Sequence, residues 1–137
     1  EQTSARLDQV GMAGLADRPY GALSTGQQRR CLLARALVTG AGHLVLDEPL
    51  AGLDPGAAYR LLALLGELMD GGVHIVLATH HVHEILPQVE HVVLLQDGAV
   101  VGAGQRRKWL TDQTISELYG LKLRLVTAGD YQFALPA

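Results

Sequence analysis

The sequence predicts an α/β fold, in which strands alternate with helices. Two short apolar runs, at residues 44–46 and in "VHIVLAT" at 73–79, have the length of strands buried on both faces, as in a parallel sheet. Segments with apolar residues at three- and four-residue spacing surround these runs and predict helices. Both runs lead into charged or imidazole side chains, and ligands of open parallel sheets bind beyond the carboxyl ends of the strands. A functional site is therefore expected at that edge.

Length and composition indicate one soluble domain. The chain has 137 residues, of which 48% are hydrophobic, and a net charge of -3, so it can bury a core. The mild acidity argues against broad nucleic-acid binding. No apolar run approaches the roughly 18 residues of a membrane span, and the first residues of this sequence lack the basic segment and short apolar stretch expected of a signal peptide. Cys31 is the only cysteine, which excludes an internal disulfide and predicts a buried thiol in a reducing, cytosolic compartment.

Local signals place the first helices. Residues 5–10 predict a short helix, and "ADRPYG" at 16–21 predicts a turn. Ser24 can cap the next helix, because Gln27 follows three residues later and can reach back to the cap. This helix is expected to continue to about residue 38. Its inner stripe comprises Leu32, Leu33, Ala36 and Leu37.

A second capped helix is expected after the first apolar run. Asp54 followed by Pro55 is a helix-start signal, with a capping side chain before a proline in the first turn. The helix would end near Gly71. Its inner stripe comprises Leu61, Leu62, Leu65, Leu68 and Met69. Beyond the second apolar run, a short helix is predicted over 82–89.

Turn residues organise the last third of the chain. Asp97 and Gly98 in "HVVLLQDGAVVGAG" mark a hairpin turn between two strands. Two short helices are predicted within 105–119, and Gly120 ends the second of them. The stretch "LKLRLV" at 121–126 alternates between apolar and polar residues, which predicts a half-exposed strand.

Two features suggest phosphate chemistry, each with an ordinary structural alternative. Asp47 and Glu48 follow a buried apolar run, where an Asp can hold Mg²⁺ and a Glu can polarise an attacking water, although the pair could instead cap the following turn. Buried carboxylates incur a desolvation cost that packing does not explain, which favours the functional interpretation. The helix start at Ser24 can attract a phosphate, or can be only an ordinary capped helix.

The segment "THHVHE" at 79–84 carries three histidines and Glu84. It could ligate a transition metal, but the spacing is a poor fit and no second ligand cluster exists elsewhere in the sequence. The histidines could also be solvated or capping groups, or His80 alone could sense a phosphate, which is the interpretation we favour. The basic run at 106–108 beside Trp109 predicts a solvated helix face and not a nucleic-acid patch.

Four motifs in order resemble those of the ATP-binding-cassette (ABC) ATPases: "LSTGQ" at 23–27, "LVLDEP" at 44–49, "AGLD" at 51–54 and "ATH" at 78–80. The resemblance implies ATP and Mg²⁺ as ligands. It identifies Asp47 with the Walker B aspartate that holds Mg²⁺, Glu48 with the general base and His80 with the switch histidine that contacts the γ-phosphate. The signature motif, usually LSGGQ, corresponds to Leu23, Ser24, Thr25, Gly26 and Gln27, with Thr25 departing from it. The D-loop corresponds to Ala51, Gly52, Leu53 and Asp54.

By this resemblance the chain is part of a P-loop NTPase core, with a mostly parallel sheet flanked by helices and a C-terminal hairpin. Residues 1–40 would end the helical subdomain, and residues 41–137 would form the C-terminal part of the ATPase core. The family grips ATP with a loop of the GxxGxGK[ST] kind, but the only lysines here are Lys108 and Lys122, and neither follows a glycine. The sequence, which opens on Glu1, is therefore expected to be a fragment that does not hydrolyse ATP alone.

The missing phosphate-loop strand has a structural consequence. The resemblance implies that this strand lies between two others, the strand that ends at Asp47 and the strand that ends at His80. Its absence would leave unpaired N–H and C=O groups on two apolar strands, which is costly. We therefore predict that residues 44–47 and 73–79 either pair directly in a contracted sheet or exchange strands with a second copy of the chain.

The resemblance also implies a function and partners. The intact protein would be the ATPase subunit of an ABC transporter, on the cytoplasmic face of the cell membrane. In this family, the signature motif of one ATPase subunit closes over the ATP of a second, which predicts a homodimer bound to transmembrane permease subunits. The tail at 114–126 is similar to that of importers of siderophores, haem or vitamin B12. The alternatives are a soluble, ribosome-associated ABC ATPase and a His-rich metal-binding module.

Overall fold

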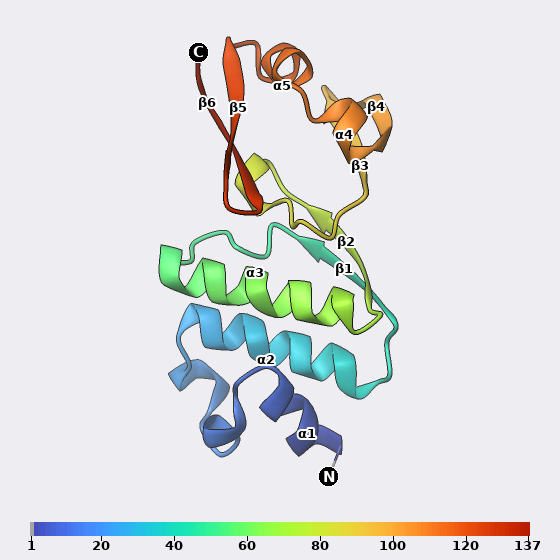
Figure 1. Ribbon diagram of the computed structural model, residues 1–137. Helices are drawn as coiled ribbons and strands as arrows, with labels where there is room; N and C mark the ends of the chain where they lie inside the picture. Colours follow the sequence, from blue (N-terminus) through green and yellow to red (C-terminus); the bar gives the residue numbers. More distant parts are fainter. Residues whose placement is uncertain (1) are drawn as a thin grey trace. The chain divides into compact units, whose positions relative to one another are not determined.

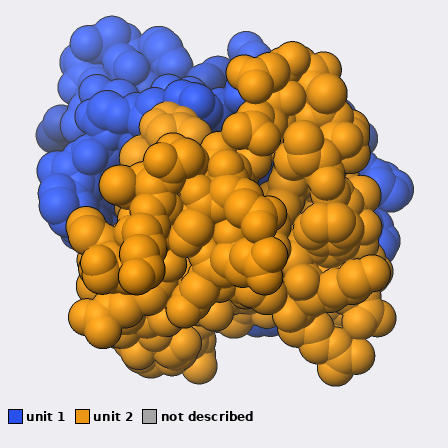
Figure 2. Space-filling view, turned by 90° about the horizontal axis from the view of Figure 1, so that it is seen from above, with its two compact units in different colours: residues 1–79 blue, residues 80–137 orange. Residues whose placement is uncertain are grey.

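The computed structural model describes residues 2–137, which form two compact units. Unit 1 ends at Thr79, and unit 2 is His80–Ala137 (Figure 2). Both units combine helices with strands, so the predicted α/β class is confirmed (Figure 1). The predicted division after residue 40 refers to the subdomains of a whole ATPase and stays a prediction.

The two long helices of unit 1 begin where their caps predict, whereas the first helix begins at Gln2, before the predicted start at residue 5. The helical segments of this unit are α1 (Gln2–Gln9), the 3₁₀ turns η1 (Ala13–Leu15) and η2 (Tyr20–Ala22), α2 (Thr25–Val38) and α3 (Pro55–Asp70). The two long helices, α2 and α3, lie side by side in Figure 1. The buried side chains of α3 include Leu61, Leu62, Leu64, Leu65 and Leu68. The predicted stripe is thus largely confirmed, with Leu64 added and Met69 only half-buried.

The inner face of α2 differs from the prediction. Leu33, Ala34 and Leu37 are buried, whereas Leu32 is 38% exposed and Ala36 is half-buried. The helix is therefore rotated so that its contact with the rest of unit 1 centres on Leu33 and Leu37. Several residue triplets on an apolar helix satisfy the same spacing, and packing against α1 and α3 selects among them. Cys31 is a free, half-buried thiol, less enclosed than expected.

One pair of parallel strands ends at the edge where the functional site is expected. In unit 1, β1 (His43–Asp47) pairs with β2 (His74–Ala78) in a regular ladder from His43↔His74 to Asp47↔Ala78. Of the two outcomes predicted for these strands, direct pairing is the one observed, and no strand of residues 2–137 lies between them. The other two strand pairs of residues 2–137 form separate antiparallel sheets, so parallel pairing is limited to the β1–β2 sheet.

The two faces of this pair differ in exposure. Leu44 and Leu46 on β1 are buried or half-buried and share a cavity wall with Leu61 and Leu65 of α3. On the opposite face, Val45 is 79% exposed, and its ladder partner Val76 is 64% exposed. The prediction of burial on both faces is therefore wrong for this chain, because the helices of unit 1 pack against only one face of the pair.

Unit 2 contains two hairpins. In the first, β3 (His91–Gln96) pairs with β4 (Ala99–Gln105) through the predicted Asp97–Gly98 turn, where both residues have positive φ, 51° and 77°. The short helix α4 (Arg106–Trp109) follows, and the Trp109 ring packs so closely that a Cβ on Gly102 would lie 2.5 Å from it. Only a glycine fits beneath this ring.

The second hairpin packs with the last helix. It joins β5 (Leu123–Ala128) to β6 (Tyr131–Pro136). The family resemblance implied a C-terminal hairpin, and the residue pattern located the strand at 121–126 but not the strand that follows it. The preceding helix, α5 (Asp112–Tyr119), ends at Gly120 in the left-handed conformation, as predicted. Val82, Leu110 and Ile115 form the buried cluster of this region, with half-buried residues of α5, β5 and β6 around it.

The predicted helix over 82–89 is wrong. Only one 3₁₀ turn forms, η3 (Val82–Glu84), after which Ile85 is extended with ψ 106°. Pro87 provides the reason, because proline lacks an N–H and disfavours the helical conformation of the residue before it.

Candidate functional site

The start of α2 is a complete capping box. The Gln27 N–H donates to Ser24 Oγ at 3.3 Å, and the Ser24 N–H donates to Gln27 Oε1 at 2.9 Å. The preceding Leu23 is buried and anchors the turn, while Thr25 is exposed. The predicted cap is therefore confirmed, and the remaining N–H groups of the first turn give this end of the helix partial positive charge.

The turn before α3 is built in a similar way. The Leu53 N–H donates to the Leu50 carbonyl at 3.1 Å, and Gly52 supplies a positive φ of 76°. Asp54 then caps α3 by accepting the Ala57 N–H at 2.9 Å, with Pro55 in the first turn. The cap predicted from Asp54 and Pro55 is confirmed.

These two helix starts meet at one cavity of about 400 Å³. Gly26 allows the approach, because a Cβ at this position would lie 3.2 Å from the Ala57 Cβ. The lining residues are Ser24, Thr25, Gly26, Gln27, Arg30, Gly52, Leu53, Asp54, Ala57 and Arg60. Two helix N-termini and two arginines line a cavity that contains one carboxylate, and this balance of charge favours an anion. The Arg30 guanidinium also donates to the Val10 and Gly11 carbonyls, each at 3.4 Å. The sequence analysis placed both turns in a site but did not single out Arg30 or Arg60.

The carboxylate pair lies at the end of β1. Both Asp47 and Glu48 are exposed. Glu48 has a φ of 42°, in the left-handed region that non-glycine residues seldom adopt. Two main-chain hydrogen bonds hold it there: its N–H donates to the Ala78 carbonyl at 2.9 Å, and its own carbonyl accepts the Ala51 N–H at 3.1 Å. Backbone strain of this kind occurs preferentially at functional sites.

The donor chemistry at this edge suits Mg²⁺. Among residues 2–137 no group of three or more His, Cys, Asp or Glu side chains is placed to hold a metal ion. A closed protein cage for zinc is thus lacking in the described chain, and the histidine cluster gives the metal-module alternative no support. Mg²⁺, in contrast, is commonly held by one or two carboxylates together with water and substrate phosphates, which an exposed Asp47 can provide.

His80 begins unit 2 and is held through its main chain. Its carbonyl accepts the Tyr119 hydroxyl at 2.6 Å, while its exposed ring lies 3.9 Å from the His81 ring, centroid to centroid. Partial burial raises the pKa of the Tyr119 phenol, a group whose ordinary pKa already leaves it protonated near neutral pH. Sequence reasoning missed Tyr119, because no local signal relates two residues 39 positions apart.

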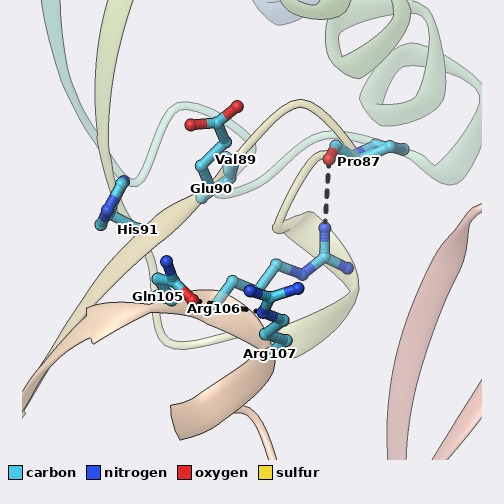
Figure 3. Close-up of a pocket in the computed structure, with 7 residues that line it drawn as sticks. All are labelled: Pro87, Val89, Glu90, His91, Gln105, Arg106 and Arg107. Carbon is cyan, nitrogen blue, oxygen red and sulfur yellow. Dashed lines mark hydrogen bonds between the residues drawn. The ribbon is translucent and has the colours of Figure 1, made fainter.

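Arg106 and Arg107 of the basic run line a second cavity, of about 390 Å³, in unit 2 (Figure 3). Arg106 reaches across to main-chain carbonyls, those of Leu86 at 2.9 Å and Pro87 at 3.5 Å, and Arg107 donates to Gln105. Burial lowers the pKa of Arg106. The predicted solvated face is therefore wrong for Arg106, whose guanidinium fastens the segment before β3 to the start of α4.

Comparison with known proteins identifies the class. Residues 6–85 match the family model described as "AAA domain, putative AbiEii toxin, Type IV TA system". "Uncharacterized ABC transporter ATP-binding protein YlmA" of Bacillus subtilis (strain 168) is 36% identical over 135 residues, covering 97% of this chain and 51% of that protein. "Hemin import ATP-binding protein HmuV" of Jannaschia sp. (strain CCS1) is 34% identical over 140 residues, which cover 95% of this chain and 52% of that protein.

Solved structures agree with these relatives. The ADP conformation of MJ1267, an ATP-binding cassette of an ABC transporter, has a TM-score of 0.75 at 28% identity, over 86% of this chain and 48% of that one. "An inward-facing conformation of a putative metal-chelate type ABC transporter" has a TM-score of 0.87 at 24% identity, over 99% of this chain and 56% of that one. This second likeness shows the fold.

The chain thus belongs to the AAA-domain family of ATPases and, within it, corresponds to about half of an ABC transporter ATPase domain. It spans about half the length of the curated relatives it matches. The family expected from the four sequence motifs is confirmed.

Proposed function

We propose that this chain is part of the ATP-binding subunit of an ABC transporter, in which ATP binding and hydrolysis drive a solute through a membrane permease. The observation that carries the proposal is Glu48, a non-glycine residue held at positive φ directly after Asp47, where a parallel strand ends. Such an edge is where ligands of parallel sheets bind, and a strained acidic residue there is more easily explained by chemistry than by packing.

Each candidate residue has a role in this proposal. Asp47 would hold Mg²⁺, which when bound supplies positive charge to the phosphate oxygens of ATP. Glu48 accepts a proton from the attacking water, and its exposed position leaves it reachable from solvent. His80 contacts the γ-phosphate with its exposed ring.

The cavity between the starts of α2 and α3 would serve a second subunit. In the proposed homodimer, the signature residues 23–27 and the D-loop residues 51–54 face the ATP bound by the partner. The convergent helix N-termini and the positive charge of Arg60 on the cavity wall support this assignment, because they favour the negative charge of a triphosphate.

The proposed partners are permease subunits, and the proposed location is the cytoplasmic face of the cell membrane. None of the helices within residues 2–137 is both long and apolar enough to cross a bilayer. The match to a hemin import protein and the tail at 114–126 support an importer of haem, siderophores or vitamin B12. Other relatives are named for phosphonate import and for lipopolysaccharide export. A direct transport assay with haem, siderophores and vitamin B12 therefore tests this choice of solute.

The role of Glu48 can be tested in a protein that carries both halves of the ATPase. Glu48→Gln should lower the ATP turnover rate by about 100-fold or more and leave ATP binding intact, because the amide keeps the shape but cannot accept a proton. His80→Ala should also lower turnover. Glu67→Gln, an equivalent change at an exposed site on α3, serves as the matched control and should behave as the parent.

Parental turnover by both Glu48→Gln and His80→Ala would contradict the assigned roles. The 137-residue chain alone should show no turnover, because its sequence contains no lysine-bearing phosphate loop. Transport itself is tested by purification from membranes: the whole protein should be recovered with permease subunits, and recovery with ribosomes would favour the soluble alternative.

A further inference from the structure

The segment that carries His80 is held in part by the C-terminal part of unit 2. This part, α5 with the β5–β6 hairpin, is here called the C-terminal module (residues 112–136). Three contacts join it to residues 80–84, and they differ in kind: one hydrogen bond, one aromatic stack and one apolar cluster. In Figure 1 the yellow turn of η3 lies beside the base of the β5–β6 hairpin.

The hydrogen bond reaches the candidate phosphate sensor directly. Tyr119, in the last turn of α5, donates its hydroxyl to the His80 carbonyl at 2.6 Å. The bond is short for an O–H donor and is made to main chain, so it restrains the backbone from which the His80 side chain projects. His80 itself is an exposed residue.

Two further contacts fix the residues that follow. The His83 ring stacks on Phe133 of β6, with centroids 5.7 Å apart and planes within 7°. Val82 is buried in one cluster with Leu110 and Ile115, and half-buried residues of β5 and β6 pack around them. The segment is therefore held from one side at His80, Val82 and His83.

Tyr119 acts from a rigid support. Thr111 caps α5, and Gly120 ends it with a positive φ of 64°. The Ser116 hydroxyl bonds both the Asp112 carbonyl and the main chain of Leu123, which ties α5 to β5. A group on such an element can hold another to within a fraction of an ångström, and catalytic geometry requires that precision.

We propose that Tyr119 is a positioning residue: by donating to the His80 carbonyl, it sets the place of the candidate γ-phosphate sensor and so links the C-terminal module to ATP turnover. This inference rests on the proposed role of His80. It concerns turnover and not ATP affinity, since correct placement of one phosphate contact matters most when the γ-phosphate departs.

Tyr119→Phe tests the proposal in the protein that carries both halves of the ATPase. The substitution keeps the ring and removes only the hydroxyl. It should lower kcat about fivefold, the equivalent of one ordinary hydrogen bond, while KM for ATP stays within about twofold. Tyr20→Phe is the matched control, an exposed tyrosine in unit 1, and should leave both constants unchanged.

Two more variants distinguish a loss of His80 positioning from a general loss of ATP binding or folding. In a Glu48→Gln background, which should bind ATP without hydrolysing it, adding Tyr119→Phe should leave the Kd for ATP unchanged. Phe133→Leu removes the ring that stacks on His83 but keeps an apolar side chain. Like Tyr119→Phe, it should lower kcat, here by about twofold. It also tests the module if Tyr119→Phe fails to fold.

The outcomes distinguish this inference from the function on which it rests. If His80→Ala lowers turnover but Tyr119→Phe and Phe133→Leu have the parental kcat, the positioning role is wrong while the proposed function stands. A weaker Kd in the double variant, or a rise in KM that matches the fall in kcat, would also overturn it. If His80→Ala itself turns over ATP at the parental rate, the proposed role of His80 fails first.

Discussion

Unit 1 and unit 2 hold their candidate catalytic residues by different means. In unit 1, Glu48 is placed by main-chain hydrogen bonds to Ala78 and Ala51, at the end of a strand whose inner face packs toward α3. In unit 2, His80 is placed by a side chain, because the Tyr119 hydroxyl reaches it from a helix 39 residues away. Main-chain placement follows from strand pairing and caps, whereas side-chain placement depends on how distant elements pack.

The cores of the two units are also built differently. Unit 1 is built around long helices whose leucines are almost completely buried, as in α3. Unit 2 relies on two hairpins, one small buried cluster and the fit of the Trp109 ring over glycine. We therefore expect unit 1 to be sensitive to loss of apolar volume and unit 2 to be sensitive to added volume.

The largest effect is expected from Leu65→Ala in unit 1. Leu65 is 0% exposed, so truncation removes buried apolar contacts and leaves a cavity, which should lower the free energy of unfolding by about 2–5 kcal/mol. Chemical denaturation of the purified chain, followed by circular dichroism, measures the change. Val45→Ala is the control and should cost less than about 0.5 kcal/mol, because Val45 is largely exposed. Equal losses in the two variants would contradict the difference in burial between Leu65 on α3 and Val45 on β1.

Gly102→Ala should have the next largest effect, in unit 2. The new methyl group would meet the six-membered ring of Trp109 at 2.5 Å, and the resulting overpacking should destabilise by about 1–3 kcal/mol. Trp109 is the only tryptophan, so its fluorescence reports the displaced ring directly. Gly14→Ala is the matched control, because a Cβ there meets nothing within 4 Å. An unchanged emission spectrum and an unchanged unfolding midpoint in Gly102→Ala would show that the fit is looser than described.

A smaller effect is expected from Ser24→Ala at the start of α2. Loss of the hydroxyl removes the acceptor for the Gln27 N–H, which should lower the unfolding free energy by about 1 kcal/mol. Hydrogen exchange should speed up in the first turn of α2 and stay unchanged at the capped start of α3. Asp54→Ala provides the reciprocal change, since Asp54 caps α3 in the same way. Faster exchange at both helix starts in either variant would mean that the two caps are not independent.

Elements marked by local chemistry were predictable. Ser24 and Asp54 place the starts of α2 and α3, Gly120 places the end of α5, and Asp97–Gly98 places the first hairpin turn. Each of these signals acts within about four residues, through a hydrogen bond to a cap or through a positive φ. The motifs that identified the family are also short and contiguous, which is why they could be recognised without coordinates.

Elements decided by packing were predicted less well. The residue pattern did not locate the strand β6, and the helix expected over 82–89 is one 3₁₀ turn. The outward position of Leu32 and the exposed face of β1–β2 also differ from expectation. Apolar spacing shows that a segment can bury a face, but the neighbours available in the folded chain determine which face is buried.

The sequence by itself determined the family, the capped helix starts, the hairpin turn and the identity of the carboxylate pair, because each depends on side chains close together in the chain. Only the tertiary structure decided the direct pairing of β1 with β2, the meeting of the two capped helix starts at one cavity, the left-handed conformation of Glu48 and the Tyr119 bond to His80. These depend on contacts between residues distant in sequence. Such contacts form only when the packing of whole elements compensates the entropy of closing the intervening chain.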